Sequence, residues 1–126
     1  MIHGVGVDIV QLARIQHAVA AYGERFLKRI YCPGEIAHCE ADGDERITRY
    51  AARFAAKEAA FKAFRNELGD ALSWHDFEVQ CDPAGEPQLV LSGRAAEVCG
   101  QLGITRIHLS LSSTSISASA IVVAEK

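Results

Sequence analysis

The segment RYAARFAAKEAAFKAF, residues 49–64, constrains the fold most strongly, because it predicts a long helix with little polar surface. On a helical wheel its alanine side chains gather in one broad sector and its aromatic side chains in another. Neither sector is suited to an open solvent face. We therefore expect a helix over about residues 45–67 that is not exposed to solvent on either apolar sector.

Two charged residues, Glu58 and Lys62, lie in a gap between these sectors, four residues apart and with the acid first. One interpretation is a simple exposed ion pair that contributes about 0.3 kcal/mol. The other is a ligand site, because charges held against apolar walls cost desolvation energy unless a partner compensates them. Glu58 would then bind a divalent cation, and Lys62 would bind phosphate oxygen atoms. On the other side of the helix, Arg49 and Lys57 are expected to be solvated or salt-bridged.

The N-terminal stretch IHGVGVDIV alternates as a β-strand does. One face carries His3, Val5, Val7 and Ile9, and the other carries Ile2, Gly4, Gly6, Asp8 and Val10. The glycines beside Asp8 leave room for something to approach the backbone closely. Since magnesium usually takes one or two carboxylates and completes its shell with water and phosphate, Asp8 is the natural second carboxylate for a cation at Glu58.

The rest of the chain mixes helical and strand patterns. Helices are predicted over residues 12–31, with a break near Gly23, and over residues 33–40 and 93–103; strands are predicted over residues 76–81, 88–91, 106–112 and 117–125. This order favours an α+β fold in which a mainly antiparallel sheet packs against the long helix. With 126 residues and no linker or repeat, we expect one domain over residues 1–126.

Charge is unevenly distributed along the chain. The net charge is −3, yet residues 46–65 hold six basic residues and one acid, which suggests an anionic partner for this segment. Duplex DNA would usually require a basic chain overall, and no aromatic–basic RNA motif is present. We therefore favour a smaller anion or an acidic protein, and no nucleic acid.

No signal peptide or membrane-spanning stretch is apparent, so the sequence predicts a cytoplasmic protein. Its four cysteines form no C-x-x-C pair. Free and mostly buried thiols in a reducing compartment are therefore expected in preference to a zinc site.

Three blocks, GVGVDIVQLARI, RFAAKEAAFKAF and HLSLSST…SAIVVAE, resemble the holo-[acyl-carrier-protein] synthases, the small bacterial type of 4′-phosphopantetheinyl transferase. The motifs W-x-D-x-E-V and D-x-x-G-x-P stand between them in the expected order. The resemblance implies transfer of the phosphopantetheine arm of coenzyme A to a serine of apo acyl carrier protein, with release of adenosine 3′,5′-bisphosphate. It also implies the α+β fold of this family, a magnesium requirement and a homotrimer with active sites between subunits.

By the same resemblance, Asp8 and Glu58 correspond to the metal ligands, and Lys62 to the base that contacts the pyrophosphate. Phosphoryl transfer depends on charge neutralisation and in-line positioning more than on covalent help from the protein, which suits these residue types. Lys62 would neutralise charge that develops on the phosphate oxygens. The base that deprotonates the carrier serine is either Glu58 or a metal-bound water that Glu58 holds.

Further residues match positions that bind substrate in the family. Arg53 and His108 correspond to contacts with the nucleotide end of coenzyme A, and Gly85 and Pro87 to a loop against the adenine. For the carrier protein, Arg14 corresponds to the arginine that docks its acidic helix, and Arg25, Lys28 and Arg29 add to that patch.

Three positions depart from the family pattern. Arg65 and Glu67 stand where glycines are usual, and Ser113 stands where the family often has histidine. Glycines would allow close approach to coenzyme A phosphates, whereas Glu67 adds a repelling charge. These departures leave open a non-catalytic paralogue that binds a carrier protein or an adenine nucleotide. Which carrier protein is modified also remains open.

Overall fold

The computed structural model describes residues 1–41, 43–64, 67–69 and 73–126, so Arg65 lies outside the described residues. Its elements are β1 (Ile2–Gln11), α1 (Leu12–Tyr22), α2 (Glu24–Ile30), α3 (Pro33–Glu40), α4 (Arg46–Ala63), the 3₁₀ helix η1 (Trp74–Asp76), β2 (Phe77–Cys81), β3 (Pro87–Leu91), α5 (Gly93–Gln101), β4 (Arg106–Ser113) and β5 (Ser117–Glu125). The predicted break at Gly23 is confirmed: this residue has a positive φ of 56° and separates α1 from α2.

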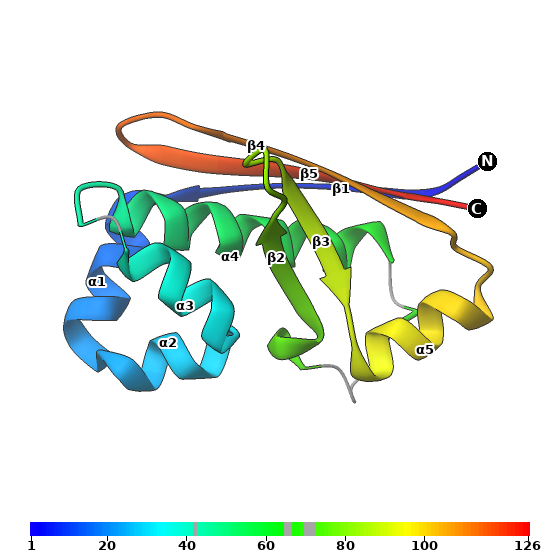
Figure 1. The fold of residues 1–126 in the computed structure, drawn as a ribbon, viewed down its shortest axis with the longest axis horizontal. Coiled ribbons are helices and arrows are strands. Elements are labelled where there is room, and N and C mark those ends of the chain that lie inside the picture. The colour runs from blue at the N-terminus through cyan, green and yellow to red at the C-terminus, as the bar shows by residue number, and fades with distance from the viewer. Residues whose placement is uncertain (42, 65–66, 70–72) are drawn as a thin grey trace.

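The strands form two antiparallel sheets. In the larger sheet β5 lies between β1 and β4, while β2 and β3 form a separate hairpin. Helix α4 runs along one face of the larger sheet, and α1, α2, α3, the hairpin and α5 lie on the far side of α4 (Figure 1). The predicted α+β fold with a mainly antiparallel sheet against a long helix is therefore confirmed.

Helix α4 is buried along most of its length because it lies between these two layers. Its alanines from Ala51 to Ala63 are all buried, and so are Tyr50 and Phe54. Small alanine side chains let the neighbouring elements approach the helix closely, which is consistent with the close packing of protein interiors. The prediction that neither apolar sector faces open solvent is confirmed.

Strand β1 approaches α4 more closely than side chains would allow. A Cβ atom on Gly4 would lie 1.9 Å from the carbonyl oxygen of Ala63, and one on Gly6 would lie 1.8 Å from that of Ala59. The room that the glycines leave is therefore filled by the backbone of α4. This contact brings Asp8, two residues beyond Gly6, beside the helix.

The predicted position of His3 on the same face as Val5 is wrong. A bulge between Ile2 and Gly4 shifts the register of β1 against β5, and this places the His3 side chain against Glu67 beyond the end of α4. Its Nε2 lies 2.5 Å from Oε1 of Glu67. Glu67, which was expected to add a repelling charge, thus has a basic partner.

The face of the larger sheet that points away from α4 is exposed and largely apolar. Val5, Val7 and Ile9 on β1 are exposed there, together with Ile121 on β5. Ser110 and Ser112 continue the same face on β4, since Ile121 and Ser119 are their partners across the strands. Among the described residues, no helix is both long and apolar enough to span a membrane.

The close packing of β1 on α4 predicts that Gly6→Ala lowers the free energy of unfolding by about 3 kcal/mol or more, because the added methyl group would overlap a helix carbonyl. Gly100→Ala is the control: this glycine lies in α5 with nothing within 4 Å of an added Cβ. Gly100→Ala should raise the free energy of unfolding by about 0.5–1 kcal/mol. Urea unfolding measures both, and equal effects of the two substitutions would contradict the packing.

Candidate functional site

Asp8 and Lys62 meet where β1 passes α4. The Lys62 ammonium donates to Oδ1 of Asp8 at 3.0 Å and to the carbonyl oxygen of Val7 at 3.0 Å. The Asp8 side chain is mostly covered, whereas 53% of the Lys62 side chain is exposed. Lys62 therefore holds Asp8 in place while much of its own side chain remains accessible to a ligand.

Glu58 lies one helical turn before Lys62 and belongs to the same charged group. Burial, followed by the nearby Asp8 carboxylate, raises the pKa of Glu58, and the Lys62 and Arg14 cations partly oppose this rise. Two carboxylates from β1 and α4 are thus close enough to repel each other. The electrostatic cost of that repulsion is the kind that a bound cation removes.

The donor set fits magnesium better than a metal held by protein ligands alone. Across the residues that the structure describes, no group of three or more His, Cys, Asp and Glu side chains could hold a metal ion. Asp8 and Glu58 supply two carboxylates, and magnesium usually takes one or two, with water and substrate phosphates completing its shell. Asp8 and Glu58 are therefore suitable ligands for a cation that arrives with a phosphate substrate.

Arg14 brings α1 to the same place. Its guanidinium lies over the ring of Phe54, 5.3 Å from the ring centroid, and the side chain is otherwise exposed. Because Arg14 lowers the pKa of Glu58, its positive charge lies near the carboxylate cluster. An acidic partner that bound Arg14 would therefore lie beside Glu58.

Arg53 lies in a different place, on the side of α4 that faces α3 and β2. It is only 4% exposed, donates to the Arg49 carbonyl oxygen at 3.4 Å, and lies 4.0 Å from the Cys81 sulfur. Its Nε is buried without a hydrogen-bond partner. Arg53 lines a depression of about 300 Å³ together with Gly34, His38, Glu78, Val79, Gln80 and Cys81.

The hairpin turn with Gly85 begins directly after Cys81, on the Arg53 side of the molecule. Gly85 has a φ of 88°, and nothing lies within 4 Å of an added Cβ, so the backbone conformation and not crowding requires glycine here. The Asp82 carboxylate accepts from the Glu86 backbone N–H at 2.9 Å and stabilises the turn. Pro87 then opens β3.

His108 lies apart from both groups. It is paired with Val123 across β4 and β5, and its Nε2 lies 3.0 Å from Oε1 of Glu125. That hydrogen bond lowers the pKa of Glu125. His108 is exposed on the sheet face opposite α4, so the sheet and the helix separate it from Arg53.

The remaining basic residues of the predicted carrier patch are exposed on α2. Lys28 pairs with Glu24, one turn earlier, at 3.4 Å. Arg25 and Arg29 flank Phe26 and, with Tyr22, line a depression of about 380 Å³. Ser113, which departs from the family pattern, is exposed at the end of β4.

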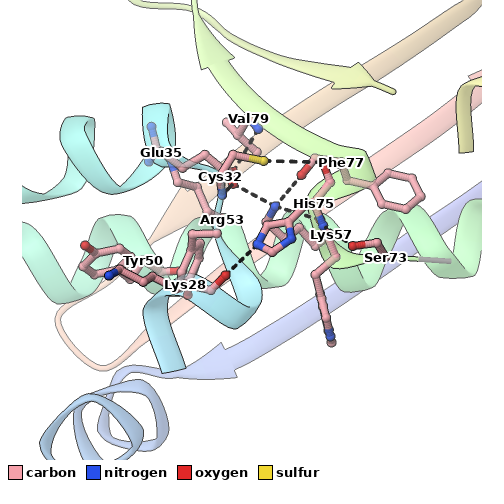
Figure 2. A network of polar contacts seen from close by, with 12 residues as sticks. Lys28, Cys32, Glu35, Tyr50, Arg53, Lys57, Ser73, His75, Phe77 and Val79 are labelled. Carbon is pink, nitrogen blue, oxygen red and sulfur yellow. Dashed lines mark hydrogen bonds and ion pairs between the residues drawn. The ribbon is translucent and has the colours of Figure 1, made fainter. Parts of the chain in front are cut away.

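Sequence reasoning missed one charged group, the buried pair of Lys57 and Glu35. Lys57 was expected to be solvated or salt-bridged; it is salt-bridged, at 2.8 Å, but both side chains are fully buried (Figure 2). A signal for Glu35 was present, because Cys-Pro-Gly-Glu places proline at the first helical position and Glu35 at the third. In the structure Glu35 accepts from the Cys32 N–H at 2.9 Å, as in a capping box.

Comparisons with known proteins find similar chains in one family. The model of the 4′-phosphopantetheinyl transferase superfamily matches residues 4–117. The chain is 47% identical over 125 residues to the holo-[acyl-carrier-protein] synthase of Koribacter versatilis (strain Ellin345), with 99% of each chain covered. The crystal structure of the holo-[acyl-carrier-protein] synthase from Neisseria meningitidis superposes with a TM-score of 0.91, at 35% identity over the whole of both chains. That of Helicobacter pylori, in complex with coenzyme A, gives 0.81 at 34% identity, covering 96% of this chain and 99% of the other.

The raised pKa of Glu58 predicts a pH-dependent effect of Glu58→Gln on stability. The folded protein holds the Glu58 proton more tightly than the unfolded chain, so stability falls as pH rises from the ordinary carboxyl pKa through the raised one. Glu58→Gln should therefore raise the melting temperature by about 1–3 °C at pH 7, and by less near about pH 4.

The matched control is Glu97→Gln, an exposed carboxylate on α5 that pairs with Arg94 at 3.3 Å. It should leave the melting temperature unchanged or slightly lower at pH 7. A gain for Glu58→Gln that is the same at both pH values would contradict the electrostatic account.

Proposed function

The chain belongs to the 4′-phosphopantetheinyl transferase superfamily, and we propose that Asp8 and Glu58 hold the divalent cation at which it transfers the phosphopantetheine arm of coenzyme A to an acyl carrier protein. The observation that supports this most directly is the convergence of Asp8, Glu58 and Lys62 from β1 and α4. Repelling carboxylates beside a half-exposed ammonium form a site that accepts a cation and a diphosphate together.

The chemistry assigns one task to each side chain. A bound magnesium ion would supply positive charge to the diphosphate and to the leaving adenosine 3′,5′-bisphosphate. Asp8 and Glu58 would hold the ion in place beside the diphosphate. Lys62 is half exposed, so its ammonium can exchange Asp8 for a phosphate oxygen and neutralise charge that develops during transfer.

The serine of the carrier protein must lose its proton as its oxygen attacks the phosphorus that bears the pantetheine arm. Glu58 accepts that proton, directly or through one water molecule. Glu58 lies near Arg14, the residue at which an acidic carrier would dock, so the serine would arrive close to this carboxylate. Adenosine 3′,5′-bisphosphate leaves with the electron pair of the broken phosphorus–oxygen bond.

We also propose a homotrimer with active sites between subunits. The exposed apolar face of the larger sheet, with Val5, Val7, Ile9 and Ile121, is a surface that a partner subunit would cover. Arg53 and His108 lie on opposite sides of that sheet. A nucleotide that contacts both residues, with the Gly85–Pro87 turn against its adenine, therefore has to bind where two subunits meet.

Acidic carrier proteins would dock on α1 and α2, where Arg14, Arg25 and Lys28 are exposed. Arg14 links this surface to the reaction because its charge lies near Glu58. We place the reaction in the cytoplasm, a reducing compartment that suits the four free cysteines.

Mass spectrometry of an apo carrier protein incubated with coenzyme A, magnesium and this protein tests the proposal. The wild type should add the mass of the arm. Asp8→Asn and Glu58→Ala should each lower the rate by about 100-fold or more while the protein stays folded, because each removes one ligand of the cation. Glu97→Gln on α5 is the control and should keep the rate within about twofold.

The same assay separates docking from chemistry. Arg14→Glu should raise the KM for the carrier by about tenfold, with a larger effect at low salt, because a favourable charge becomes repulsive. Binding of the carrier or the nucleotide without gain of the arm would mean a non-catalytic paralogue. Near-normal turnover of Asp8→Asn would refute the metal assignment.

A further inference from the structure

The pair of Lys57 and Glu35 is a hub of hydrogen bonds in the interior. The three ammonium protons of Lys57 have three acceptors: a Glu35 carboxylate oxygen at 2.8 Å, the Trp74 carbonyl oxygen at 3.1 Å, and the Phe77 carbonyl oxygen. The Lys57 side chain is 0% exposed, so these contacts replace all of its water. Figure 2 shows the ammonium at the meeting point of these groups.

Glu35 completes the hub from the other side. One of its oxygens also accepts from the Cys32 backbone N–H at 2.9 Å, and the other accepts from the Val79 backbone N–H at 3.0 Å. Both partners of the ion pair are therefore satisfied by fixed backbone groups. Four elements are joined at one point: the start of α3, the middle of α4, η1 and β2.

The attraction between the two charges by itself contributes little net stability. Replacing a buried ion pair by apolar residues of similar volume is often neutral or stabilising, because burying two charges costs about as much as their attraction returns. Directed hydrogen bonds instead specify one relative arrangement of the elements that they join. The effect of the pair therefore depends on the residues that those elements carry.

Each joined element leads to a different part of the active site. On α4 the next residue after Lys57 is Glu58. On β2 the chain continues to Cys81, beside Arg53, and into the turn with Gly85. In η1, His75 bonds the carbonyl oxygen of Lys28 at 2.6 Å, which connects the hub to the basic helix α2 (Figure 2).

The hub adds directed bonds to an apolar contact on the same side of α4, where Phe54 and Phe61 pack against the Trp74 ring. Burial of these rings is non-directional, whereas the hydrogen bonds of Lys57 require a narrow range of distance and angle. Adjacent residues point about 100° apart on a helix, so fixing Lys57 also fixes the direction of Glu58. A displacement of about 1 Å between reacting groups can cost about 100-fold in rate.

We propose that Lys57 and Glu35 are positioning residues for the transfer reaction. They set the position of the Glu58 carboxylate relative to the hairpin turn with Gly85 and to helix α2. They touch no substrate and act only through the elements that they join. This inference rests on the proposed function.

The test compares variants in the carrier-modification assay, with kcat and KM for coenzyme A measured separately. Lys57→Met alone leaves Glu35 buried without its partner, so the informative variant is the double change Lys57→Met with Glu35→Leu, which keeps the volume and removes both charges. The control is Val98→Ala, a core truncation in α5, which is not one of the four elements that the hub joins. Melting temperatures are recorded for both, and rates are measured well below each.

The double variant should lose about 30-fold or more in kcat, with KM for coenzyme A changed by less than about threefold, because the reacting groups are misaligned while the nucleotide contacts persist. Val98→Ala should keep kcat within about twofold of the wild-type value, even if its melting temperature falls as far as that of the double variant. A folded double variant whose kcat equals that of the control, or whose KM alone changes, overturns the positioning role. An inactive wild type would instead overturn the proposed function.

Discussion

The contact between the backbones of β1 and α4 is the constraint on which the rest of this structure depends. Gly4 and Gly6 have no side chains, so the strand lies directly against the carbonyl groups of Ala63 and Ala59. Asp8 follows on the same face and is carried to the helix that holds Glu58 and Lys62. One packing contact thus joins two acidic residues that are fifty positions apart in the chain.

Helix α4 organises charge on two sides in two different ways. Toward β1 and α1, Glu58 and Lys62 remain partly exposed. The pKa of the Glu58 carboxylate is raised there by burial and by Asp8. Toward α3 and β2, Lys57 is sealed from water and fully paired with Glu35. A partly exposed side with repelling carboxylates and a fixed, fully paired side are consistent with the rigid scaffold that a functional site requires.

Much of this arrangement could be predicted from the sequence, because the patterns are local. The alternation of β1, the breaking role of Gly23 and the alanine sectors of α4 follow from periodicity and backbone freedom. Tertiary contacts decided the rest. Three features each depend on a partner more than fifteen residues away in the chain. They are the α4 backbone that fills the space beside the glycines of β1, the bulge that places His3 against Glu67, and the burial of Lys57 against Glu35. The separation of Arg53 from His108 likewise appears only once the sheet is built.

A crystal structure of the protein with coenzyme A and magnesium would test the central claim most directly. The account predicts one ion with an oxygen of Asp8 and an oxygen of Glu58 each about 2.0–2.1 Å away, and the diphosphate completing its shell. An ion held by coenzyme A alone, with Asp8 still paired to Lys62 and Glu58 directed elsewhere, would contradict it.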